Sequence, residues 1–193
     1  MNHSSRARLF TKINGPWHKR ATLIVLTIIV GHWVEHVMQA YQVYGLNQAR
    51  PHAHGAIGVL FPWLVTSEWL HYGYVGGILA GLVLVRPGFT GRARLWWNAA
   101  VVVQLWHCIE HSLLLGQAAS GHNLFGGAVP TSILQLVVPR LELHLFYNAM
   151  GFVPMVIGLF YHLFPPAGEW PTECHCAESK GILSQPSWRP TSQ

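Results

Sequence analysis

Residues 101–117 read VVVQLWHCIEHSLLLGQ, an apolar stretch interrupted by two histidines and a glutamate. Such a stretch is typical of a membrane-spanning helix, which needs about twenty mainly apolar residues. An ionisable side chain at the centre of a bilayer costs about 2.5–3.5 kcal/mol on insertion scales. His107, Glu110 and His111 therefore need polar partners or a bound ion to offset that cost.

The same pattern occurs earlier in the chain, where residues 32–36 read HWVEH and are followed by Gln42. Its two histidines, glutamate and glutamine all recur 75 residues later, in the stretch quoted above. A looser echo, at a spacing of 73 residues, relates His71 to His144. These spacings predict two tandem helical hairpins related as a parallel repeat, with a pseudo-twofold axis along the membrane normal.

The composition also indicates a membrane protein. Of the 193 residues, 51% are hydrophobic and 10% are charged, whereas a soluble domain has about 25% charged residues. Nine tryptophans add to this pattern, because aromatic side chains favour the membrane–water interfaces. The net charge of +5 comes from basic residues at the ends of apolar stretches, so no nucleic-acid partner is expected. We predict an all-α integral, multi-pass protein of the cell (plasma) membrane, with lipids as its partners.

Hydropathy predicts a four-helix transmembrane bundle within residues 21–164, preceded by a basic leader (1–20) and followed by a flexible tail (165–193). Most lysines and arginines precede the first span, lie between the second and third, or follow the fourth. The positive-inside rule then predicts that both termini, and with them the leader and the tail, are cytoplasmic. The predicted spans are about 21–46, 64–86, 95–117 and 140–164.

Helix geometry places the polar residues of these spans on shared faces. Residues at i, i+3 and i+4 share a face, which unites the histidines and glutamate of each HxxEH motif and joins Glu68 to His71. Glu142 and His144 are two residues apart and should point about 200° from each other. Both can face the site only if the helix begins irregularly near Pro139. All four motifs fall in the outward half of the membrane, which predicts one metal site with the candidate ligands His32, Glu35, His36, Glu68, His71, His107, Glu110, His111, Glu142 and His144.

Histidine and carboxylate together suit iron, copper, zinc or manganese. Ten candidate ligands exceed the three or four that one zinc ion needs, which favours two ions or a set of carboxylates that orient the ligating histidines. Residues 68–71 (EWLH) resemble the Glu-x-x-His motif of di-iron carboxylate four-helix bundles, although the other helices read His-x-x-Glu-His. The histidine content also resembles membrane desaturases and alkane hydroxylases, whose histidine boxes hold two irons; this chain lacks their adjacent histidine pairs. We take both as chemical analogies and assign the chain to neither family.

A redox metal among apolar helices favours substrates that partition into the bilayer. We therefore expect a di-metal iron or copper oxidoreductase acting on a hydrophobic molecule or a quinone, with no catalytic residue assigned. Whether the chain is itself an enzyme stays open. The alternative functions are a metal-binding or electron-transfer accessory subunit, a small proton or metal-ion transporter, and a purely structural polar network. The alternative cofactor is a b-type haem held by His36 and His111. The partner chains would be those of a larger membrane complex or further copies in a homo-oligomer.

Cysteine is rare in the chain. Cys108 lies in a predicted span and is expected to be a small buried hydrophobe. Cys174 and Cys176 fall in the predicted cytoplasmic tail, so no structural disulfide is expected. Residues 174–176 (CHC) form a weak metal-binding pattern that suits a labile copper or zinc site. His162, at the end of the last span, is expected to be an interface anchor.

Overall fold

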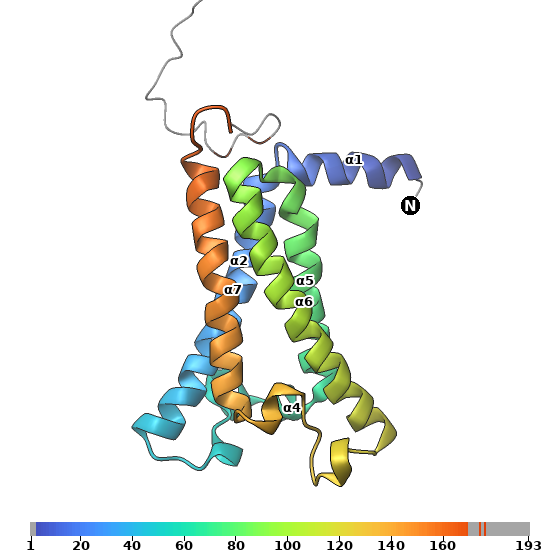
Figure 1. Ribbon diagram of the computed structural model, residues 1–193, viewed down its shortest axis with the longest axis vertical. Helices are drawn as coiled ribbons and strands as arrows, with labels where there is room; N and C mark the ends of the chain where they lie inside the picture. The colour runs from blue at the N-terminus through green and yellow to red at the C-terminus, as the bar shows by residue number, and fades with distance from the viewer. Residues whose placement is uncertain (1–2, 170–173, 175, 177–193) are drawn as a thin grey trace, which may run out of the picture.

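The computed structural model describes residues 3–169 together with Cys174 and Cys176. Within these residues every regular element is a helix. Four helices, with the short turns that continue two of them, are long and apolar enough to cross a membrane. This confirms the expectation of an all-helical protein with four candidate spans. These helices are α2 (His18–Ala40), α5 (Glu68–Val85), α6 (Gly91–Ser120) and α7 (Arg140–Leu163) (Figure 1).

The remaining elements are short and lie between or before the spans. Residues of the predicted leader form a helix of their own, α1 (His3–Asn14). Of the predicted tail, 165–193, the structure describes 165–169, Cys174 and Cys176, and the other residues lie outside the described part. The connecting elements are η1 (Tyr41–Gly45), η2 (Arg50–His52), α3 (Gly55–Leu60), α4 (Pro62–Thr66), η3 (Arg86–Gly88), η4 (Leu124–Gly126) and η5 (Leu134–Leu136).

The four long helices form a bundle in which α2 packs against α5 and α7, and α6 packs against the same two helices. Helix α1 lies across one end of this bundle, where the α5–α6 turn and the last residues of α7 are also found (Figure 1). We call this the α1 end. The connections that follow α2 and α6 lie at the opposite end, which we call the loop end (Figure 1).

An apolar core closes the α1 end of the bundle. Trp97 of α6 is fully buried beside Phe89 and Met155, and its indole Nε1 donates a hydrogen bond to the Leu82 carbonyl at 3.0 Å. Close helix packing adds to this core, because a Cβ atom at Gly158 of α7 would lie 3.1 Å from the Ala93 carbonyl oxygen of α6. Apolar packing therefore fixes this end, and the histidines predicted as metal ligands lie nearer the loop end.

Two glutamines tie the loops to the helices that precede them. The Gln42 amide nitrogen donates to the Gly55 carbonyl at 3.2 Å, and its oxygen accepts from the Gly55 amide at 2.8 Å. Gln117 makes the same pair of bonds with Thr131, at 2.9 and 3.2 Å. Gly55 has φ +73°, a conformation that favours glycine. Each of the two loop-end segments is thus folded back onto the end of the helix that precedes it.

Candidate metal centre

Six of the predicted ligands form one cluster inside the bundle, which we call the histidine cluster. The Nε2 atom of His111 lies 3.1 Å from the Nε2 atoms of both His107 and His144. On α2, His36 Nε2 lies 3.2 Å from His32 Nε2. The ring centroids of His36 and His144 are 5.0 Å apart, and those of His71 and His111 are 5.8 Å apart in parallel planes. The structure therefore brings together His32, His36, His71, His107, His111 and His144 from α2, α5, α6 and α7.

Hydrogen bonds orient two of these rings so that their Nε2 atoms face the cluster. His36 Nδ1 lies 2.8 Å from the side-chain oxygen of Gln39, and His144 Nδ1 lies 2.7 Å from the Arg140 carbonyl oxygen. Both oxygens accept, so each Nδ1 carries the proton and each Nε2 presents a lone pair. A metal-ligating histidine is held in the same way, with its other ring nitrogen donating to a carbonyl or amide oxygen.

The spacing of the ring nitrogens also suits a cation. Two imidazole ligands of a tetrahedral ion lie about 3.3 Å apart, given metal–nitrogen bonds of about 2.0–2.1 Å. The Nε2–Nε2 separations of 3.1–3.2 Å in the histidine cluster are close to that value. One proton can bridge only two of these nitrogens, whereas one cation can accept lone pairs from three or four of them.

Burial makes unsatisfied lone pairs costly at this position. His36, His107, His111 and His144 are each at most 5% exposed. Among the described residues, the Nδ1 atoms of His71 and His111 are buried without a hydrogen-bond partner. An unpaired buried polar group costs about 1–3 kcal/mol. A ligand that organises the whole cluster is therefore the simplest physical account of it.

The Glu35 carboxylate lies outside the histidine cluster and accepts hydrogen bonds from a neighbouring segment. It accepts hydrogen bonds from the backbone amides of Ala56, Ile57 and Gly58, each at 3.1 Å. These amides belong to the first turn of α3, which has no earlier carbonyl partners within its own helix. A negative charge there also complements the helix dipole.

The Glu110 carboxylate accepts hydrogen bonds from the segment that follows α6 and from α7. One oxygen accepts from the Leu134 amide at 2.9 Å, and the other accepts from the Tyr147 hydroxyl at 2.7 Å. The Tyr147 ring stacks on His107, with ring centroids 4.8 Å apart, and its hydroxyl accepts from the Trp106 indole. Glu110 thus positions His107 indirectly, through the tyrosine.

The other two glutamates form ion pairs at the loop end. Glu68 accepts two hydrogen bonds from Arg140, at 2.5 and 2.9 Å. Glu142 pairs with Arg50 at 2.5 Å and also accepts from the Tyr44 hydroxyl; this contact raises the pKa of the Arg50 guanidinium. Helix α7 begins regularly at Arg140, so Glu142 turns away from the cluster that His144 joins. All four predicted carboxylate ligands thus have partners other than the histidine nitrogens.

Two cavities reach the histidine cluster. The larger, of about 230 Å³, lies at the loop end and is lined by His36, His71 and His144 together with Arg50 and Arg140. The smaller, of about 30 Å³, lies on the other side of the cluster beside His32 and is otherwise largely apolar. A cavity of that size holds about one small molecule, such as water.

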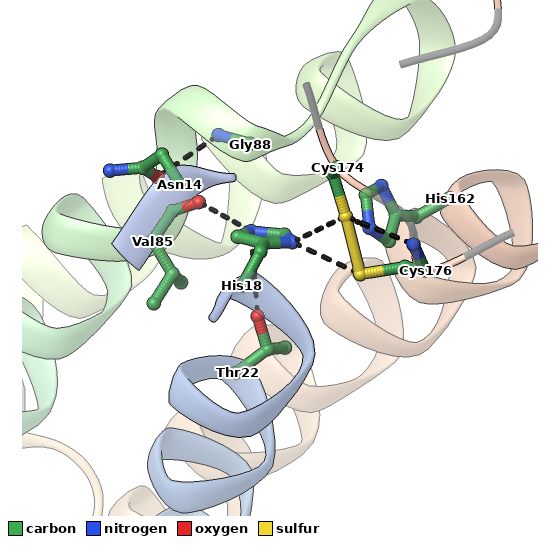
Figure 2. Close-up of a disulfide and its surroundings, with 8 residues drawn as sticks. All are labelled: Asn14, His18, Thr22, Val85, Gly88, His162, Cys174 and Cys176. Carbon is green, nitrogen blue, oxygen red and sulfur yellow. Dashed lines mark hydrogen bonds between the residues drawn. A yellow bond between two sulfur atoms is a disulfide. The ribbon is translucent and has the colours of Figure 1, made fainter. Parts of the chain in front are cut away.

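A second group of candidate ligands lies at the α1 end, far from the histidine cluster along the helices. It consists of His18, His162, Cys174 and Cys176, whose ligand atoms all lie within 4.8 Å of one another (Figure 2). We call it the Cys/His group. His162 was expected to be an interface anchor, yet it is 3% exposed and faces the cysteines.

The expectation that the tail forms no disulfide was wrong, because the structure joins Cys174 to Cys176 (Figure 2). Sequence reasoning treated the Cys-x-Cys pattern and His162 separately and omitted His18. A useful signal was available, since His18 and His162 begin and end the first and fourth spans on the same side of the membrane.

Comparison of the chain with protein-family models, with curated proteins and with solved structures found no match.

Proposed function

We propose that the histidine cluster binds two transition-metal ions, copper or iron, and carries out redox chemistry on a hydrophobic molecule or a quinone in the membrane. One observation carries this proposal: six imidazoles from four candidate spans meet inside the bundle, four of them buried and two, His32 and His71, half-buried. His107, His111 and His144 are the proposed ligands of one ion, because their ligand atoms lie within 4.8 Å of one another. His32, His36 and His71, the equivalent residues of the first half, are the proposed ligands of the other.

Parallel contacts in the two halves support this division and the predicted internal repeat. Gln42 and Gln117 make the same pair of bonds to their loops. Tyr74 stacks on His32 as Tyr147 stacks on His107, with ring centroids 4.8 Å apart in both pairs. A repeat that supplies three histidines per half favours two ions of similar coordination.

The chemistry of the donors supports copper first and iron second. All six proposed ligands are neutral imidazoles, which suit copper, iron and zinc better than manganese. The glutamates that would neutralise a higher charge are bound to loop amides and arginines. An ion that can hold a single positive charge is therefore the least costly to bury, which favours the copper(I)/copper(II) couple.

The surroundings support a small or apolar substrate. The helices carry exposed apolar side chains such as Val102 and Ile24, which a bilayer would cover. The small cavity beside His32 has room for one molecule of the size of dioxygen or water, and the larger cavity gives a second approach from the loop end. A site of this kind limits bulk water at the metal.

The test is metal analysis of the full chain purified in detergent, with optical and electron paramagnetic resonance spectra. We expect about two copper or iron atoms per chain, and oxygen consumption when a short-chain quinol is added. His111→Ala should remove most of the bound copper or iron, because His111 contacts three other histidines of the cluster. His122→Ala, in an exposed loop, is the matched control and should leave the metal content unchanged.

Two results would refute the proposal. A Soret band would establish haem in place of two separate ions. Protein that binds neither copper nor iron after reconstitution, while retaining its helical circular dichroism, would leave a polar network or an ion pathway as the remaining explanation.

A further inference from the structure

We propose that the Cys/His group is a tetrahedral zinc site that forms when both cysteines are reduced. It is separate from the histidine cluster and does not depend on the function proposed above. Two sulfur and two imidazole ligands in tetrahedral geometry are typical of structural zinc sites.

The sulfur–nitrogen distances within the group match such a site. Bonds of about 2.3 Å from zinc to sulfur and about 2.0–2.1 Å to nitrogen place tetrahedral sulfur and nitrogen ligands about 3.5 Å apart. The Cys174 sulfur lies 3.3 Å from His18 Nδ1 and 3.5 Å from His162 Nε2. The Cys176 sulfur lies 3.5 Å from His18 Nδ1. The imidazole nitrogens are thus as far from the sulfurs as two ligands of one zinc ion are from each other.

The ring of His18 is held in the orientation that a ligand needs. Its Nε2 lies 2.9 Å from the Val85 carbonyl oxygen, which accepts the Nε2 proton and leaves the Nδ1 lone pair directed at the sulfurs (Figure 2). A Cβ atom at Gly88 would lie 2.3 Å from the imidazole ring, so glycine makes room for it. The Val85 contact is the outer-sphere hydrogen bond that commonly fixes the tautomer of a zinc-bound histidine.

The group is enclosed rather than displayed on the surface. His18, His162, Cys174 and Cys176 are 0%, 3%, 5% and 6% exposed. The Phe89 ring packs against both imidazoles, with centroid distances of 5.0 and 4.5 Å. Among the described residues, His162 Nδ1 is buried without a hydrogen-bond partner. Four convergent ligands within an apolar wall form a closed site, as structural zinc requires.

The charges also balance. Two thiolates carry a total charge of −2 and two neutral imidazoles carry none, so one Zn²⁺ ion gives a neutral complex. A neutral complex avoids the large cost of burying an uncompensated charge. Without an ion, the reduced cysteines would be protonated thiols.

The disulfide seen in the structure is the oxidised form of this site, which lacks thiolate ligands. Two electrons and two protons from a dithiol reductant, itself oxidised to a disulfide, convert it to two thiols. Binding of Zn²⁺ then displaces both thiol protons and forms two zinc–sulfur bonds. The zinc site would join the segment after α7 to the beginning of α2.

Cobalt(II) is the sharpest probe, because a thiolate-to-cobalt charge-transfer band arises from cysteine ligands and cannot come from the histidine cluster. We expect the full chain, reduced and held in detergent, to bind one Co²⁺ with this band and with the intense visible bands of a tetrahedral site. Excess Zn²⁺ should abolish both. Cys174→Ser and Cys176→Ser should each weaken this band, and the double variant should remove it, whereas Cys108→Ser, the matched control, should retain it in full.

The two histidines are tested by affinity. His162→Ala should weaken Co²⁺ binding by more than the about 10- to 100-fold expected for loss of an outer-sphere contact. His18→Ala should do the same, and His162→Ala decides the question if His18→Ala does not fold, as judged by circular dichroism. Absence of the band in reduced wild-type protein would overturn the proposal. Unchanged affinity in folded His162→Ala would also overturn it, because His162 would then not be a ligand of the metal.

Discussion

At the scale of single residues, the glutamates and histidines of each HxxEH motif have separated roles. The histidines face the centre of the bundle, while Glu35 and Glu110 accept hydrogen bonds from loop amides. The three polar residues of each motif share one helix face, and a loop folds over part of that face. Backbone amides of the loop donate hydrogen bonds to the carboxylate, so the histidines remain available to a cation.

This separation predicts that Glu35→Ala lowers stability without removing metal. Loss of the contacts to the first turn of α3 should cost about 1–2 kcal/mol, the usual range for a helix cap. Thermal unfolding followed by circular dichroism would measure the loss, and elemental analysis would show unchanged copper or iron. His36→Ala, one residue further along α2, is the matched comparison and should lose metal. Folded Glu35→Ala protein without metal would instead identify Glu35 as a ligand.

At the scale of whole helices, the position of the site depends on how closely α6 and α7 pack. Gly158 of α7 faces backbone atoms of α6, with the Trp97 amide nitrogen 3.2 Å from a Cβ placed there. Backbone cannot move aside as a flexible side chain does. The short contact therefore sets the distance between the two helices that carry His107, His111 and His144.

Gly158→Ala should force α6 and α7 apart and destabilise the protein by about 1–3 kcal/mol, the usual cost of overpacking. The matched control is Gly151→Ala on the same helix, where the nearest atom, Val103 Cγ1, is 3.9 Å from the added Cβ. Melting temperatures of both variants in the same detergent would test this. Equal stability of the two variants would contradict it.

At the scale of the molecule, α1 lies at one end of the bundle and the connections that follow α2 and α6 lie at the other (Figure 1). Most basic residues fall at the α1 end, so the positive-inside rule predicts that this end is cytoplasmic. This orientation of the bundle across the membrane can be tested by labelling in sealed vesicles.

Ser4→Cys on α1 and Ala128→Cys after α6 test it, each in a chain whose three native cysteines are replaced by serine. Both positions are exposed. In sealed right-side-out vesicles, a membrane-impermeant maleimide should label the cysteine at position 128, whereas the one at position 4 should react only after lysis. Labelling in the opposite pattern would reverse the assigned orientation.

The sequence was sufficient to predict the four spans and the meeting of the six histidines, because face and depth follow from helix periodicity and chain direction. Periodicity placed Glu142 and His144 about 200° apart, so that both could face the site only if the helix began irregularly near Pro139; α7 begins regularly at Arg140. The partners of the glutamates were not predictable in this way. They are loop amides such as that of Leu134 and arginines such as Arg50, whose positions depend on how irregular segments fold.

The Cys/His group shows the same limit over a longer range. His18 and Cys174 are separated by 156 residues, and no periodicity connects a helix start with a segment beyond the last span. Their contact follows from the whole bundle, which brings the beginning of α2 and the end of α7 to the same end.

Helix α1 lies across the bundle axis rather than along it (Figure 1), and Asn14 at its end is bonded to the Leu84 carbonyl and the Gly88 amide. If the four long helices cross a bilayer, α1 would lie along its surface, where the exposed side chains of Arg6, Arg8 and Lys12 would meet the lipid headgroups. Sliding the bundle along the membrane normal would lift those cations off the lipid phosphates or press them into hydrocarbon. Helix α1 would thus fix the depth of the bundle in the membrane. In membranes of different thickness, the imidazole layer would stay at a constant distance from the leaflet that α1 contacts.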